Sequence, residues 1–353
     1  MQEHQDPLGA FSSWGELYEL ERKQRKDAFF RVGLALSVLL AVTVVMQYAV
    51  MAVVVKLFPH AANAWWLNWV LSLVPLYGFG LPAFWLVIKG IEKRDKNAMY
   101  VSLGYALPKP AFGVKDFLIL TVIGAGLLYI GNFIGTVLME MLSAAVGYDY
   151  QNALTNVMDT SPPWIVVLGT VVIAPWGEEL IFRKLLMDRT RGFGDGIAIL
   201  VSAVAFGLFH GNLFQFFYAF FVGLILAYIY AWSGQWLWCV GMHAIINLFG
   251  GVIMPYVTRS LRLEGDPLTD PSLAVDYAIV MGLGMVIWGL MAASVGLIIY
   301  LLKAHRVYLG ADKGEISLSV EDSVTSVLGN WGMLLAVILY VMYIAVGLLP
   351  LQN

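Results

Sequence analysis

The chain has 353 residues, of which 60% are hydrophobic and 13% are charged, and its mean hydropathy is +0.77. Soluble globular domains carry about 25% charged residues, so this composition excludes an ordinary soluble enzyme. The formal net charge is −3, and we expect no nucleic-acid partner. The chain has one cysteine, Cys239, so it cannot form an intrachain disulfide. Together these features indicate a protein embedded in a lipid bilayer.

Long apolar runs recur along the chain, and runs of about 18 residues or more are typical of polytopic helical membrane proteins. We expect an all-α bundle of about eight or nine transmembrane helices. The fifth span is about 22 Å long at about 1.5 Å per residue, too short to cross a core of about 30 Å alone. We expect a bend directly after it, at residues 210–212. The nine candidate spans are residues 29–55, 65–88, 114–143, 163–187, 196–210, 213–232, 236–257, 277–302 and 327–349.

The N-terminal segment, residues 1–28, is polar and too acidic for a signal peptide. Trp14, Leu17 and Tyr18 fall at helical spacing among charged residues. Residues 13–26 therefore form either an interfacial helix or a disordered tail.

The basic residues predict the orientation of the chain. With the N-terminus inside, 18 of the 21 lysines and arginines fall in segments on the inner side. Only Lys56, Arg259 and Arg262 fall outside. This asymmetry favours a cytoplasmic N-terminus, because inner loops of membrane proteins carry the excess of positive charge. We expect a multi-pass protein, located in the plasma membrane if the source is a prokaryote.

Two adjacent carboxylates, Glu178 and Glu179, follow an apolar run that begins at Pro163. A charge at the middle of a membrane costs about 2.5–3.5 kcal/mol even on the gentler insertion scales, so such groups need a partner or a use. Arg183 lies four residues after Glu179, which places the two on one helix face in the favourable order. Glu178 points about 100° away from Glu179. The structural alternative is a helix end whose charges reach the interface, and it fits the residues from Arg183 onward.

Two further polar clusters follow in the next spans. Phe206 and His210 are four residues apart, and so are His243 and Asn247, so each pair shares a helix face. If the helices run regularly from their inner turns, Glu178, His210 and Asn247 each lie about 18–21 Å above those turns and meet in one layer. Each group also has a structural interpretation, a buried histidine or an interhelical hydrogen bond. The convergence of all of them predicts a functional site.

The three motifs Glu-Glu-x-x-x-Arg, Phe-x-x-x-His and His-x-x-x-Asn, in this order in consecutive spans, resemble the CPBP family. This family, also called Abi, contains CAAX prenyl proteases and bacteriocin-processing or immunity proteins, and it includes the type II CAAX prenyl endopeptidase of the endoplasmic reticulum. The resemblance covers about residues 163–250. It implies an intramembrane endopeptidase that acts on a membrane-associated, CAAX-like peptide substrate, and it leaves open whether that substrate is prenylated.

The resemblance also implies residue roles. Glu178 matches the glutamate that activates the attacking water, and His210 matches the histidine that assists it. His243 and Asn247 match the groups that stabilise the oxyanion. The residue types suit these roles, because a carboxylate removed from water can act as a base near neutral pH and N–H donors stabilise a developing oxyanion.

The supporting residues implied by the resemblance are Glu179 and Arg183, as a pair, and Phe206, which opens the second motif. Members of the family are often described as metalloproteases, but the chain has no His-Glu-x-x-His helix. Glu178, His210 and His243 could supply three ligands to a catalytic zinc. In that case the base must be another group, such as Glu179. We favour a mechanism without metal or other cofactor and keep zinc as the alternative.

Two other functions remain open at the level of the sequence. Intramembrane acids and histidines also serve as proton relays in transporters, although no inverted repeat is visible. A scaffold or bacteriocin-immunity protein without catalytic activity could keep the motifs for structural reasons. The expected domains are the cytoplasmic segment 1–28, the N-terminal helices 29–145, the catalytic core 160–255 and the C-terminal helices 277–353.

Overall fold

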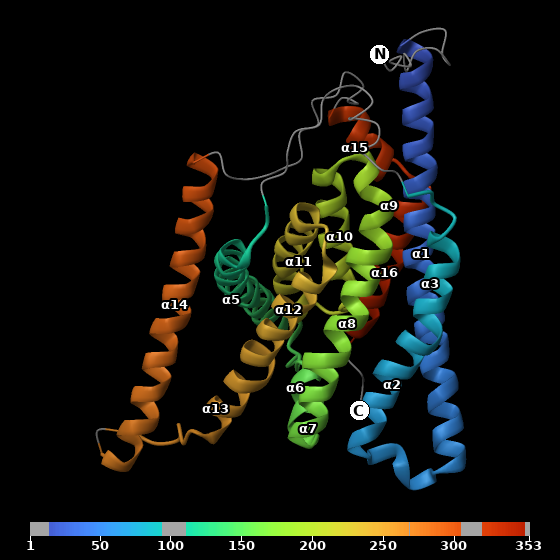
Figure 1. Cartoon of the computed structure of the whole chain (residues 1–353). Helices are drawn as coiled ribbons and strands as arrows, with labels where there is room; N and C mark the ends of the chain where they lie inside the picture. The colour runs from blue at the N-terminus through green and yellow to red at the C-terminus, as the bar shows by residue number, and fades with distance from the viewer. Residues whose placement is uncertain (1–13, 94–110, 268, 305–319, 350–353) are drawn as a thin grey trace. The chain divides into compact units, whose positions relative to one another are not determined.

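The computed structural model of the protein describes residues 14–93, 111–267, 269–304 and 320–349. Over these residues every regular element is a helix, which confirms the all-α prediction. The helices form two compact units, each assembled from separate stretches of the chain (Figure 1). Five of the basic residues counted on the inner side lie outside the described ranges: Arg94, Lys96, Lys109, Arg306 and Lys313.

Seven helices in the described residues are long and apolar enough to cross a membrane. Two shorter apolar helices, Asp195–Phe209 and Trp331–Gly347, fall where the fifth and ninth spans are expected. The nine expected spans are therefore all present as apolar helices, and the chain is an integral, multi-pass membrane protein. The seven longer helices are Tyr18–Leu57, Trp65–Ile88, Val114–Val146, Pro163–Phe193, Leu213–Ser233, Trp236–Ser260 and Pro271–Lys303.

Unit 1 contains the stretches Met1–Ala111, Leu180–Asn212 and Tyr308–Asn353. Its first helix runs without a break from residue 14, so the interfacial helix expected at 13–26 is the start of the first span and not a separate element. The helices of unit 1 are α1 (Trp14–Leu57), η2 (Pro59–Asn63), α2 (Trp65–Leu73), η3 (Val74–Gly80), α3 (Leu81–Ile88), η5 (Leu180–Met187), α9 (Asp188–Thr190), η6 (Arg191–Phe193), α10 (Asp195–Phe209), α15 (Val320–Leu328) and α16 (Trp331–Gly347).

The core of unit 1 forms where α16 packs along α1 (Figure 1). A side chain at Gly332 would meet the backbone of Phe30, so glycine lets the two helices approach closely. Asn330 accepts a hydrogen bond from the Gly332 N–H at 3.0 Å and caps α16. Its amide also donates to the Lys26 carbonyl at 2.6 Å, which joins the start of α16 to α1.

Unit 2 contains the stretches Phe112–Glu179 and Leu213–Val307. Its longest helix, α5, packs against α11, α12 and α14, and α12 also packs against α8. The helices of unit 2 are α5 (Val114–Val146), α6 (Ala153–Thr160), α7 (Pro163–Val166), η4 (Val167–Ile173), α8 (Ala174–Glu179), α11 (Leu213–Ser233), α12 (Trp236–Ile246), η7 (Asn247–Ile253), α13 (Met254–Ser260), η8 (Pro271–Leu273) and α14 (Ala274–Lys303).

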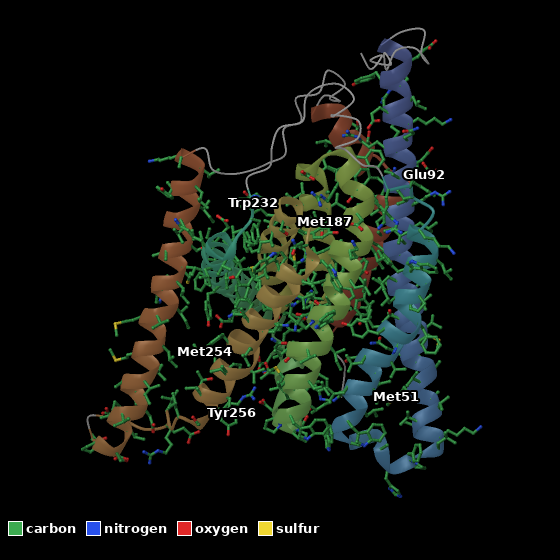
Figure 2. All side chains as sticks on the ribbon, in the orientation of Figure 1. Met51, Glu92, Met187, Trp232, Met254 and Tyr256 are labelled. Carbon is green, nitrogen blue, oxygen red and sulfur yellow. The ribbon has the colours of Figure 1, made fainter. Side chains whose placement is uncertain are left out.

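Aromatic side chains lie at both ends of unit 2. Figure 2 labels Trp232, near the end of α11, and Tyr256, on α13 at the opposite end. Trp232 packs edge-on against Phe112, and Tyr256 is exposed. Tryptophan and tyrosine are enriched at the two membrane interfaces, so this placement fits a unit that spans the bilayer.

Three of the apolar helices contain four π-helical segments in all, in which each backbone hydrogen bond joins residues five apart instead of four. These segments are η3, η4, η5 and η7. Segments η3, η4 and η7 each end two residues before a proline, which removes a backbone donor from the regular ladder. π-helical turns frequently occur at functional sites. Here η4 precedes Glu178, η5 follows Glu179, and η7 begins at Asn247.

The bend expected after the fifth span is present. Helix α10 ends at Phe209, and Gly211 adopts φ 69°, a left-handed conformation that glycine tolerates best. Helix α11 then begins at Leu213.

Candidate active site

Helices α8 and α12 bring two glutamates and a histidine together in unit 2. The Nδ1 atom of His243 lies 3.0 Å from Oε1 of Glu179. The Nε2 atom of the same ring lies 3.8 Å from Oε2 of Glu178. The side chains of His243, Glu178 and Glu179 are 5%, 12% and 0% exposed. The structure thus gathers Glu178, Glu179 and His243 into one buried polar cluster within an apolar unit.

The hydrogen bond to Glu179 determines the arrangement of protons on His243. An ionised carboxylate can only accept, so Nδ1–H of the ring donates to Glu179. The other nitrogen, Nε2, then faces Glu178, at a distance suited to charge interaction and longer than a hydrogen bond. Nε2 can donate as well when the ring is an imidazolium, with a proton on both nitrogens.

Asn247 lies one turn after His243 and is held by η4. Its Nδ2 atom donates to the backbone carbonyl of Thr170 at 2.8 Å. The Thr170 hydroxyl in turn donates to the Val166 carbonyl at 2.7 Å. An amide nitrogen carries two N–H groups, so one N–H fixes the orientation of Asn247 while a second N–H remains on the same atom.

The second motif forms its own cluster in unit 1. His210 Nδ1 donates to the Phe206 carbonyl at 2.8 Å, because a carbonyl can only accept. In the neutral ring this leaves Nε2 as the acceptor. The Phe206 ring packs edge-on against the His210 ring and lies under the Arg183 guanidinium, 4.9 Å from its carbon. The fully buried Arg183 also donates to the Ser202 hydroxyl at 3.0 Å.

Of the residues predicted from the sequence, Glu178, Glu179, His243 and Asn247 belong to unit 2, and the other three belong to unit 1. The approach of His210 to Glu178 stays a prediction, as does the pairing of Glu179 with Arg183. The catalytic roles of all seven residues likewise stay predictions.

Two residues that hold the predicted ones, Ser202 and Thr170, are not predicted from the sequence motifs. Ser202 precedes Phe206 and His210 at intervals of four, so a longer helical pattern on α10 would have identified it. Thr170 acts through its backbone carbonyl, which no residue type reveals. Helical spacing could have found Ser202, whereas the contact of Thr170 depends on the fold.

A zinc site requires three protein ligands around one point. Among the residues that the structure describes, no group of three or more His, Cys, Asp or Glu side chains is arranged to hold a metal ion. In unit 2, the Nδ1 atom of His243 is engaged by Glu179. The absence of a metal stays a prediction, and the chemistry proposed below uses no metal.

Comparison with known proteins identifies this same region. A family model described as "Type II CAAX prenyl endopeptidase Rce1-like" matches residues 160–249, about a quarter of the chain. No curated protein and no solved structure matches the chain. The matched region begins just before α7 and ends in η7, so it contains all three motifs and both polar clusters. Residues 160–249 are therefore similar to the Rce1-like family of type II CAAX prenyl endopeptidases.

Proposed function

We propose that this protein is an intramembrane endopeptidase that uses Glu178 to activate a water molecule. His210 assists Glu178, and His243 and Asn247 donate hydrogen bonds to the oxyanion. The observation that carries the proposal is the buried placement of Glu178 beside His243, with 3.8 Å between Oε2 and Nε2, inside an apolar helical unit. Groups of this kind are costly within a membrane and are usually functional.

The reaction follows from these groups. Glu178 takes a proton from water while the water oxygen attacks the carbonyl carbon of the scissile peptide. The carbonyl oxygen becomes an oxyanion and accepts hydrogen bonds from His243 and from the second N–H of Asn247. When the intermediate collapses, the carbon–nitrogen bond breaks and the proton held by Glu178 passes to the leaving nitrogen. The products are a carboxylic acid and an amine, and Glu178 is ionised again.

The substrate we propose is a membrane-anchored peptide with a CAAX-like C-terminus. The family model that matches residues 160–249 supports this class of substrate. The abundance of basic residues on the predicted inner side supports a cytoplasmic N-terminus. In a prokaryote the protein would reside in the plasma membrane.

The decisive experiment measures cleavage of a fluorogenic CAAX-like peptide by the purified protein, with prenylated and unprenylated versions compared. Glu178→Gln keeps the shape of the side chain but removes the proton acceptor, so we expect a loss of about 100-fold or more. His210→Ala should be similarly damaging. His243→Ala and Asn247→Ala should each cost about 10²–10³ in rate by removing an oxyanion donor. Wild-type protein that cleaves no peptide would contradict the proposal.

The same preparation separates the competing functions. Proton flux into proteoliposomes without cleavage would indicate a transporter, and the absence of both activities would indicate a scaffold or immunity protein. We expect full activity after exhaustive chelation. Zinc bound in stoichiometric amount, lost in the His210 and His243 variants and tracking activity, would contradict the metal-free mechanism and leave the location of the site unchanged.

A further inference from the structure

Two consecutive glutamates contact two different nitrogens of one imidazole ring. Successive side chains on a helix point about 100° apart, so two neighbours can lie on either side of a group that is directed between them. The ring of His243 occupies that position, with Glu179 at Nδ1 and Glu178 at Nε2. The packing of α12 against α8 places the ring there.

We propose that Glu179 is the positioning residue for His243. By accepting a hydrogen bond from Nδ1–H, it fixes the orientation of the ring and turns Nε2 toward Glu178, where the peptide is attacked. This inference rests on the proposed function. It gives the second glutamate of the motif the task of orienting His243, the proposed oxyanion donor. It adds a task to Glu179 that is separate from the expected pairing with Arg183.

Because the contact between Glu179 and His243 is buried, we expect substitution of Glu179 to have a large effect. Glu179 is fully buried and His243 is 4% exposed, so neither group can exchange this hydrogen bond for one with bulk water. Removal of Glu179 leaves the Nδ1–H without its acceptor and the ring free to turn, so the Nε2 donor is misplaced when the oxyanion forms. Loss of a group that orients a reactive histidine can cost several orders of magnitude in rate.

A double-mutant cycle in the full-length protein tests this assignment. In the wild-type background, Glu179→Ala should lower kcat by about 100-fold with KM changed by less than about 2-fold. In the His243→Ala background the same substitution should cost less than about 2-fold, because its target is already gone. Equal losses in the two backgrounds would overturn the proposal. Glu179→Leu, which fills much of the same volume but cannot accept a hydrogen bond, provides the same cycle if the alanine variant does not fold.

A spectroscopic measurement tests the contact without relying on activity. The protein has five histidines, and labelling them with ¹⁵N allows the Nδ1–H proton of His243 to be assigned by its disappearance in His243→Ala. This signal should be lost or shifted in Glu179→Ala. It should persist in Glu140→Ala, the matched control, because Glu140 is an exposed carboxylate on α5 of the same unit. A signal unchanged in Glu179→Ala would overturn the proposal, whereas a wild-type protein without cleavage would contradict the proposed function.

Discussion

At the scale of single residues, the two N–H groups of the Asn247 side chain have different roles. One N–H is bonded to the Thr170 carbonyl, and the other is proposed to meet the oxyanion. In Asn247→Asp the side chain cannot donate when ionised and places its oxygen against that carbonyl. We expect kcat to fall by about 10²–10³ and the free energy of unfolding to fall by about 1–3 kcal/mol. Cleavage assays and thermal unfolding measure the two effects.

Thr170→Val provides the matched control for Asn247→Asp. It removes the hydroxyl that donates to Val166 but keeps the backbone carbonyl that Asn247 uses. We expect this variant to keep nearly full activity. If it loses as much activity as Asn247→Asp, the side chain of Thr170 and not its carbonyl would be the important group.

Arg183 carries a second prediction at this scale. Its guanidinium is fully buried, donates to Ser202 and lies over the Phe206 ring. Arg183→Leu removes these contacts, and if Arg183 also pairs with Glu179 the loss should be about 3–5 kcal/mol in unfolding free energy. In that case the double variant Glu179→Gln with Arg183→Leu should recover part of the stability. Strictly additive effects on the unfolding temperature would contradict the pairing.

The sequence locates the polar residues of the site but does not specify all their contacts. Motif spacing places His243 and Asn247 on one helix face, and their expected depth in the membrane places them near Glu178. Which oxygen meets which nitrogen depends on how α8 and α12 pack, and no local pattern encodes that. For this reason the sequence predicts Arg183 as the partner of Glu179 and does not reveal His243.

At the scale of the elements, span positions were predictable because hydropathy and length dominate in a bilayer. All nine expected spans coincide with apolar helices. The π-helical segments were not predictable, because a spacing argument assumes about 3.6 residues per turn throughout. A local cause is nevertheless visible for three of the segments, since η3, η4 and η7 each end two residues before a proline: Pro82, Pro175 and Pro255.

Close packing of α5 depends on its glycines, which gives a prediction for this element. A Cβ atom at Gly131 would lie 2.5 Å from the Cα atom of Tyr218 on α11, so the two backbones would have to separate. Gly131→Val should therefore lower the unfolding free energy by about 1–3 kcal/mol or more. Gly289→Ala on α14 is the control, since a Cβ atom there meets nothing within 4 Å. Equal unfolding temperatures for the two variants would show that the crossing tolerates a side chain.

At the scale of the whole molecule, the distribution of basic residues predicts the membrane topology. Cysteines introduced at Ser13 and Ser317, which lie outside the described residues, should both react with an impermeant reagent only from the cytoplasmic side. A cysteine at Glu264, in the loop after α13, should react from the outside. The native Cys239 is fully buried and donates to the Leu226 carbonyl, so it should give little background.

The outcome at Ser317 decides the number of crossings. Labelling of this position from the outside would contradict the nine-span count, because an even number of crossings must separate it from the N-terminus. Outside labelling at Ser13 would reverse the orientation of the entire chain.

Because of the π-helical segment η4, the number of residues in this transmembrane helix matters for the site as much as their apolar character does. A π-helical turn accommodates more residues than an α-helical turn of the same helix, and η4 stands between the start of the span and Glu178. A single-residue deletion within residues 171–173, after Thr170, would leave an apolar helix that still crosses the membrane. The residues before the deletion would, however, rotate by about 100° relative to Glu178, and the Thr170 carbonyl would turn away from Asn247. Insertions and deletions are usually tolerated best in loops. In this transmembrane helix, a change of one residue would leave the hydropathy almost the same. It would, however, rotate one part of the helix relative to the other, so that side chains facing the substrate in one part no longer align with those in the other.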